Sequence, residues 1–109
     1  MSVIPPKIKK ELEKDPRMKK CLACGNTSVQ WHHALQYSGK SIQETFAIQP
    51  LCPKCHMGNS MKPTEYASIM SELVAITMGY KILIKKYPKF NWLQRKSYLE
   101  FKLKKYVSN

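Results

Sequence analysis

Hydrophobic residues recur with helical spacing along residues 64–87, and this pattern predicts one long helix. Thr64, which follows Pro63, is expected to cap its first turn, because a threonine hydroxyl can accept from a free backbone N–H group. Gly79 is expected to interrupt or end the helix. The predicted apolar face comprises Tyr66, Ile69, Met70, Leu73, Ile76, Thr77 and Tyr80.

A second helix is predicted at residues 92–107, after the break that Pro88 imposes. Asn91 stands directly before it and is a suitable N-cap residue. Its bulky apolar side chains, Trp92, Tyr98, Leu99 and Phe101, are interspersed with basic ones. Trp92, at its start, and Trp31 are interpreted as anchors of the hydrophobic core rather than as platforms for nucleic-acid bases.

A short helix is also predicted near the N-terminus, starting at Pro5-Pro6 and ending near Asp15. Its only apolar residues at helical spacing are Ile8 and Leu12, four positions apart. A stripe this narrow buries little surface, so we expect the helix to lie on the outside of the molecule.

Between these helices, the pattern favours two extended segments. Residues 28–35 predict a strand with Val29 and Trp31 on one face. A second extended segment contains Phe46, Ile48 and Leu51 and leads to Cys52.

The residues around these segments predict turns and one helical start. Residues 38–40 contain a glycine turn, and we interpret Gly-Lys-Ser there as a plain loop, since the first glycine and the strand of a phosphate-binding loop are missing. Pro53 favours the start of a helical turn carrying Cys55 and His56.

The four cysteines form two pairs, each with two residues between its members: Cys21 with Cys24, and Cys52 with Cys55. This spacing lets four thiolates surround one ion in the tetrahedral shell that zinc prefers. Disulfides are the alternative, but the first ten residues contain two prolines and no apolar run typical of a signal peptide. Redox chemistry is also less favoured, because a redox CxxC motif is usually single. A chain of 109 residues, expected to form one domain, benefits from such a metal because its core is small.

The formal charge of +12 lies at the two ends of the chain. Residues 1–20 carry seven basic and three acidic side chains, residues 81–109 carry nine and one, and residues 21–80 carry three of each. This distribution favours nucleic acid, here DNA, as the partner. The alternatives are solvated lysine faces or a basic helix on an anionic membrane surface. No apolar stretch of about 18 residues is evident, so we expect no membrane span. The predicted contacts to nucleic acid are Arg95, Lys96, Lys102, Lys104 and Lys105.

Three histidines remain once four sulfurs have filled a structural site: His32, His33 and His56. The order CxxC, extended segment, HH, loop, extended segment, CxxCH resembles the zinc-stabilised branch of the HNH nuclease family. The specific parts are WHH at 31–33 and IQPLCPKCH at 48–56. The run WHHALQYSGKSIQETFAIQPLC is also similar to small HNH-like proteins of phages and prophages.

This resemblance covers residues 21–59 and implies a small zinc-stapled ββα-metal core, treble-clef-like, which we place at 21–62. With the helices predicted on either side, the expected fold class is α+β in a single domain 1–109, with a basic N-terminal helix in 1–20 and two helices in a basic C-terminal extension, 63–109. The resemblance also implies an endonuclease that hydrolyses DNA in the cytoplasm of a bacterial or phage-infected cell, without a small-molecule cofactor.

Two separate metals are implied by the resemblance. Cys21, Cys24, Cys52 and Cys55 would hold a structural zinc. His32 and His56 would bind a catalytic divalent ion such as Mg²⁺, Mn²⁺ or Ni²⁺, and His33 would be the general base. Imidazole suits that task because its pKa lies close to neutral pH.

The chain departs from the family at Ala47, where the motif has its middle asparagine. That asparagine normally holds the loop carrying the base, so Glu44 or Thr45 is expected to replace it. The departure keeps an alternative open: a non-catalytic zinc-finger module that binds DNA or a phage or host replication or recombination protein. In that case, His56 would lie in the second coordination shell of the zinc or be an alternate ligand of it. His32 and His33 would then be ordinary partly buried histidines or histidines that contact DNA.

Overall fold

The short strands lie between an N-terminal helix and three C-terminal helices in the computed structural model, which describes residues 4–57 and 62–107. The presence of both helices and strands agrees with the expected α+β class. The domain boundaries remain a prediction. The elements are α1 (Pro6–Lys14), η1 (Pro16–Lys19, a 3-10 turn), β1 (Gln30–His33), β2 (Gln36–Tyr37), β3 (Lys40–Ser41), η2 (Thr45–Ala47, also 3-10), β4 (Ile48–Leu51), α2 (Pro53–Met57), α3 (Glu65–Lys86) and α4 (Trp92–Val107).

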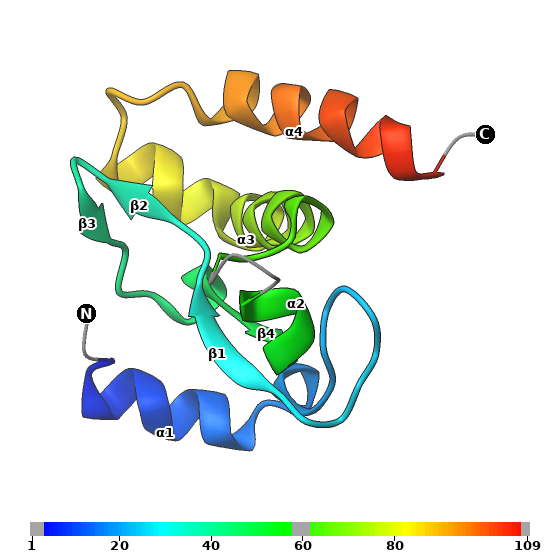
Figure 1. Cartoon of the computed structure of the whole chain (residues 1–109). Helices are drawn as coiled ribbons and strands as arrows, with labels where there is room; N and C mark the ends of the chain where they lie inside the picture. Colours follow the sequence, from blue (N-terminus) through cyan, green and yellow to red (C-terminus); the bar gives the residue numbers. More distant parts are fainter. Residues whose placement is uncertain (1–3, 58–61, 108–109) are drawn as a thin grey trace.

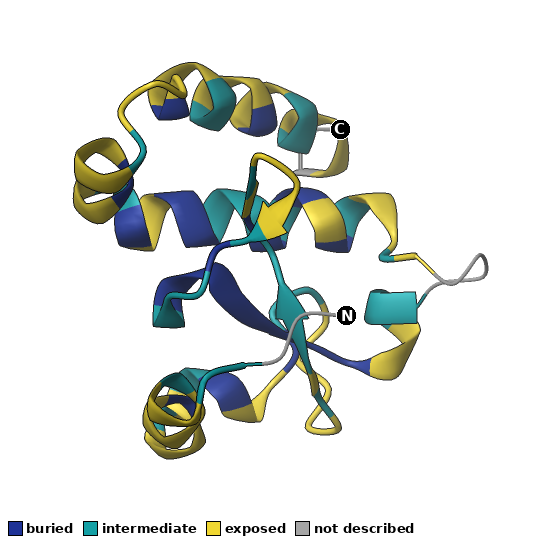
Figure 2. Cartoon of the chain, turned by 90° about the vertical axis from the view of Figure 1, so that its left-hand side faces the viewer, coloured by how far each residue is buried: buried dark blue, intermediate teal, exposed yellow. Residues whose placement is uncertain are grey.

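The elements are stacked in layers, with α1 and α4 at opposite ends of the molecule (Figure 1). The antiparallel pair β1–β4 and the short helix α2 occupy the middle, and α3 lies between them and α4. Buried residues line α3 and the strand beneath it, whereas exposed residues follow the outer sides of α1 and α4 (Figure 2). The core therefore lies on both sides of α3.

The predicted N-terminal helix is confirmed as α1, which begins after Pro5 and ends before Asp15. Leu12 is buried against Met18 and Ile48, and Ile8 packs at the edge of this cluster. The other side chains of α1 are exposed or half-buried, in agreement with its expected place on the surface.

The register of the β1–β4 pair places His32 opposite Gln49 and His33 opposite Ile48. All four residues of β4 are buried. The predicted second extended segment is too long at its start, because Phe46 lies in the 3-10 turn η2 rather than in a strand. This turn directs the Phe46 ring toward α3 before the chain straightens.

Residues 36–41, expected to contain only a loop, form the small hairpin β2–β3. Ser38 and Gly39 have φ angles of 53° and 79°, the pair of positive values that a two-residue type I′ turn requires. Strands of two residues carry too little hydrophobic pattern to be predicted from the sequence.

Helix α3 follows the predicted cap, since the Thr64 hydroxyl accepts from the Ala67 amide at 3.2 Å. Gly79 interrupts the helix with a non-helical φ of −104° and ψ of 16°, but the helix resumes and continues to Lys86. The predicted apolar face is wrong in part. Thr77 is exposed, whereas the small residues Ala67, Ser71, Ala75 and Gly79 are buried together with Ile69, Ile76 and Leu83. At Gly79 no side chain fits, because the Phe46 ring of η2 lies against it. Ala67 packs instead in the cluster of Cys21, Leu51 and Cys52.

The expectation that no stretch of the chain is long and apolar enough to cross a membrane is wrong for this helix. Residues 65–86 meet that description by length and composition. In this structure, however, Ile69, Ile76 and Leu83 pack in a common hydrophobic cluster with Trp92 and Leu99 of α4. Its apolar composition therefore follows from packing between two layers of the protein.

The last helix agrees with the prediction at its start, where the Asn91 side chain accepts from the Gln94 amide at 2.9 Å. Trp92 is 3% exposed, and its indole N–H donates to the Tyr87 carbonyl at 3.1 Å, which confirms its role as a core anchor. Trp31 is half-buried against the cluster of Leu12 and Met18.

Candidate functional site

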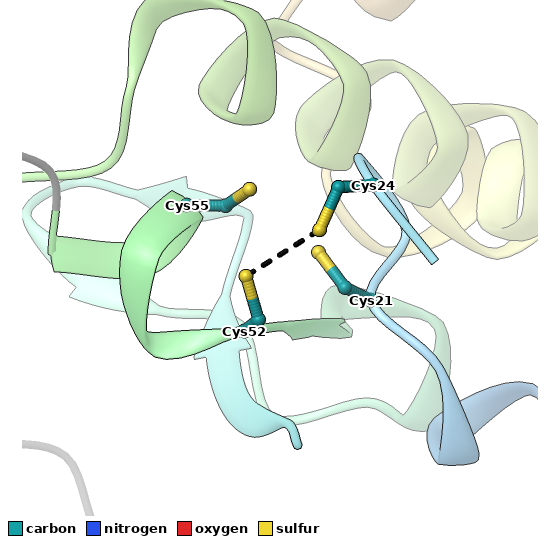
Figure 3. Close-up of side chains that lie close together, drawn as sticks. All are labelled: Cys21, Cys24, Cys52 and Cys55. Carbon is teal, nitrogen blue, oxygen red and sulfur yellow. Dashed lines mark hydrogen bonds between the residues drawn. The ribbon is translucent and has the colours of Figure 1, made fainter. Parts of the chain in front are cut away.

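The four cysteines point toward one another (Figure 3), and their sulfur atoms all lie within 4.8 Å of one another. Two of them, Cys24 and Cys52, have sulfurs 3.5 Å apart. A tetrahedral site with Zn–S bonds of about 2.3 Å requires sulfurs roughly 3.8 Å apart, so the cluster fits an ion such as zinc. Among the described residues, this is the one group of three or more metal-ligating side chains that comes together at this distance.

The first cysteine pair is held by a tight backbone turn. The Cys21 amide donates to the Asn26 carbonyl at 2.8 Å, and the Gly25 amide donates to the Cys21 carbonyl at 2.9 Å. Gly25 has a left-handed φ of 79°, which a glycine adopts without strain, whereas the φ of Asn26 is not left-handed. Its side chain instead accepts from the Ser28 amide. A further bond, from the Leu22 amide to the Pro50 carbonyl, ties this turn to β4.

The second pair lies where β4 passes into α2: Cys52 stands between the two elements, and Cys55 lies in the first turn of α2. Burial acts to raise the pKa of Cys21, but hydrogen bonds from the backbone at Cys52, Cys24 and Ala23 outweigh it and lower this pKa to about 6. Burial and the neighbouring sulfurs raise the pKa of Cys55. Crowded thiols of this kind ionise together readily only when a cation is shared among them.

His32 and His56 come into contact on the side of β1 that faces α2. Their ring centroids lie 5.0 Å apart in an edge-to-face arrangement. Burial, followed by the nearby His56 and His33, lowers the pKa of His32 to about 4, and burial also lowers the pKa of His56. Both rings are therefore neutral near pH 7, which is the form that can bind a metal.

Gln30 holds the His56 ring in place, with its amide oxygen 2.9 Å from Nδ1. With that oxygen as acceptor, Nδ1 carries the proton, and the lone pair is on Nε2. Metal-binding histidines commonly have such a partner on their other nitrogen. His56 thus faces Gln30 and His32 and does not belong to the sulfur cluster.

His33 ends β1 and lines a hollow of about 530 Å³ together with His32, His56, Gln36 and Trp31. Its Nε2 atom is buried and has no hydrogen-bond partner among the described residues. A buried, unpartnered imidazole nitrogen is unusual for a purely structural residue, since such an atom costs about 1–3 kcal/mol. The three histidines predicted from the sequence are therefore brought to one hollow.

The segment with Ala47 in place of asparagine is held by residues that the sequence did not indicate. The Arg17 guanidinium donates to the carbonyls of Thr45 (2.6 Å) and Ile48 (3.0 Å) and to the Gln49 side chain (3.1 Å). Gln49, 1% exposed, donates in turn to the Phe46 carbonyl at 2.7 Å.

Neither of the two expected replacements for the asparagine has that role. The Glu44 carboxylate bonds to Lys86 of α3, and Thr45 contributes its carbonyl oxygen to the Arg17 interaction. A lone arginine 28 or more residues away in sequence gives no local signal, which is why Arg17 was missed.

The predicted nucleic-acid residues all lie on α4, in different settings. Arg95 forms a bidentate ion pair with Glu72 of α3, at 2.5 and 2.8 Å. Lys96 lies 3.4 Å from Glu100, one turn further on. Lys102 lies over the Tyr98 ring, with its Nζ 6.0 Å from the centroid. The remaining two, Lys104 and Lys105, are exposed.

A scan against protein-family models matched no family, and searches of curated proteins and of solved structures likewise found no match.

Proposed function

We propose that this protein is a metal-dependent endonuclease of the HNH type that hydrolyses phosphodiester bonds in DNA. The observation that carries the proposal is the meeting of the three histidines: His32 and His56 in ring contact, with His33 lining the same hollow. A zinc finger that only binds a partner has no need for such a group beside a complete set of four sulfur ligands.

The order of elements around the histidines supports a ββα-metal, treble-clef-like core. A backbone turn with Cys21 and Cys24 is followed by the antiparallel pair β1–β4 and by a short helix with Cys55 and His56. In this interpretation, zinc held by four cysteines fixes β4 and α2, and so fixes His56 relative to β1.

The residues of the hollow suit hydrolysis of a phosphodiester. His32 and His56 would hold a divalent ion such as Mg²⁺, Mn²⁺ or Ni²⁺, which supplies positive charge to the phosphate and the leaving oxygen. His33 would accept a proton from the attacking water at an imidazole nitrogen. Gln30 would keep His56 oriented through Nδ1, and Arg17 and Gln49 would hold the strand opposite His32.

The test is a plasmid-nicking assay with Mg²⁺, Mn²⁺ and Ni²⁺ on the wild type and three variants. His33→Ala is expected to lower the rate by about 10²–10⁴-fold, because a general base is lost, while zinc content and DNA affinity stay near wild type. His32→Ala and His56→Ala are expected to lose metal affinity. A higher metal concentration therefore partly restores their nicking activity, but it does not restore that of His33→Ala. The matched control is Gln36→Ala, an exposed neighbour in the same hollow.

A second candidate is a non-catalytic zinc-finger module that binds DNA or a replication or recombination protein of a phage or its host. Ala47 favours it, since the family's asparagine is absent. No cleavage by the wild type in any of the three metals would establish this second function instead. A cytoplasmic location, in a bacterial or phage-infected cell, belongs to both proposals.

A further inference from the structure

A groove leads away from the histidines between α3 and α4. Its first part, about 530 Å³, is lined by His32 and His33 and by Glu72, Phe90 and Arg95. A second part, about 340 Å³, shares Glu72 and Arg95 with the first and extends along α4. The two parts adjoin at Glu72 and Arg95, and together they extend from the histidines to the middle of α4.

Arg95 stands where the two parts of the groove adjoin. Its Nε and Nη2 atoms donate to the two oxygens of Glu72, at 2.5 and 2.8 Å. Its Nη1 atom takes no part in this ion pair with Glu72, so that edge of the guanidinium can contact a ligand. An arginine fixed in this way is suited to a planar or tetrahedral anion such as a phosphate.

An aromatic ring lines each part of the groove together with Arg95: Phe90 lines the first part and Tyr98 lines the second. Phe90 is 42% exposed and Tyr98 is 48% exposed. The Tyr98 ring lies 5.3 Å from the Arg95 guanidinium carbon and 6.0 Å from the Lys102 ammonium. Exposed rings beside cations are the arrangement that binds unpaired bases, because each base stacks on a ring while its phosphate meets a charge.

We propose that this groove takes a single-stranded segment of DNA, with a phosphate at Arg95 and unpaired bases on Phe90 and Tyr98. The inference rests on the proposed endonuclease function, since it leads the strand toward His33. Duplex bases are already stacked on one another, so a duplex would use the lysines of α4 but not these rings. The substrate class is therefore DNA with an unpaired stretch, such as a flap, a gap or a free single strand.

The experiment measures the dissociation constants of a fluorescent oligodeoxynucleotide, single-stranded and annealed to its complement, without added divalent metal. The wild type is expected to bind the single strand more tightly at equal salt. Tyr98→Leu is expected to weaken single-strand binding by at least about fivefold, the lower end of one lost stacking contact, and to change duplex binding by less than about twofold. Tyr98→Phe keeps the ring and is expected to bind like the wild type.

The matched control is Phe101→Leu, which removes another exposed ring of α4, 69% exposed, that does not line the groove. Equal affinity of the wild type for both forms, or an equal effect of Tyr98→Leu and Phe101→Leu, would overturn the inference. Binding requires no cleavage, so this result is independent of the nicking assay. If the protein nicks DNA but does not prefer single strands, only the groove proposal fails. If it prefers single strands but does not nick DNA, only the endonuclease proposal fails.

Discussion

Arg17 shows how a single side chain can hold a segment that carries no suitable polar residue of its own. It satisfies two backbone carbonyls and the buried Gln49 side chain, and Asp15 fixes it from the other side at 3.0 Å. Gln49 lies opposite His32 in the register of β1 and β4. The position of the histidines therefore depends on an arginine in the N-terminal turn.

Replacing Arg17 with alanine is expected to reduce the free energy of unfolding of the zinc-loaded protein by about 2–4 kcal/mol. The reason is that the buried acceptors at Ile48 and Gln49 lose a charged donor, and each unsatisfied group costs about 1–3 kcal/mol. Urea denaturation measures the change. Lys19→Ala, an exposed cation of the same turn, serves as the control and should stay within about 0.5 kcal/mol of wild type. If both variants unfold alike, the Arg17 hydrogen bonds do not stabilise the fold.

At the scale of the elements, the contact between α3 and η2 determines how closely the two C-terminal helices approach the metal-bearing part. A Cβ atom built on Gly79 would lie 2.1 Å from the Phe46 ring, far closer than real contacts. The glycine is thus needed for space, and the break in the helix occurs at the point of closest approach.

We therefore expect Gly79→Ala to destabilise the protein by about 1–3 kcal/mol, although alanine alone favours a helix by up to about 1 kcal/mol. Thermal or urea unfolding of Gly79→Ala, Phe46→Leu and the double variant forms the measurement. Leucine lacks the ring that the new methyl group meets, so the double variant should be more stable than the sum of the single effects predicts. A Gly79→Ala protein as stable as wild type would refute the close approach.

The sequence predicted the elements whose signals are local. Thr64 and Asn91 cap helices as expected, Gly79 interrupts α3, and the CxxC spacing brings four sulfurs together. It failed where the cause is distant in sequence. At Gly79, the Phe46 ring leaves α3 no room for a side chain, and the strand opposite His32 is held by Arg17; neither partner is evident from spacing.

For the whole molecule, the two basic ends of the sequence become separate surfaces, since α1 and α4 lie at opposite ends (Figure 1). The histidine hollow lies between them, and the groove beside it leads toward α4. DNA bound along α4 would therefore pass near the histidines, whereas α1 lies on the other side of the β1–β4 pair. This hollow is the proposed site of a second metal, apart from the sulfur cluster.

The most direct measurement is a crystal structure of the protein soaked with Mn²⁺, with anomalous data collected above the zinc edge and below it. We predict zinc among the four cysteines and manganese against His32 and His56, with loss of the manganese peak alone in His56→Ala. A single metal peak at the cysteines, with the histidines bound to no ion or with His56 joined to the zinc, would contradict the account.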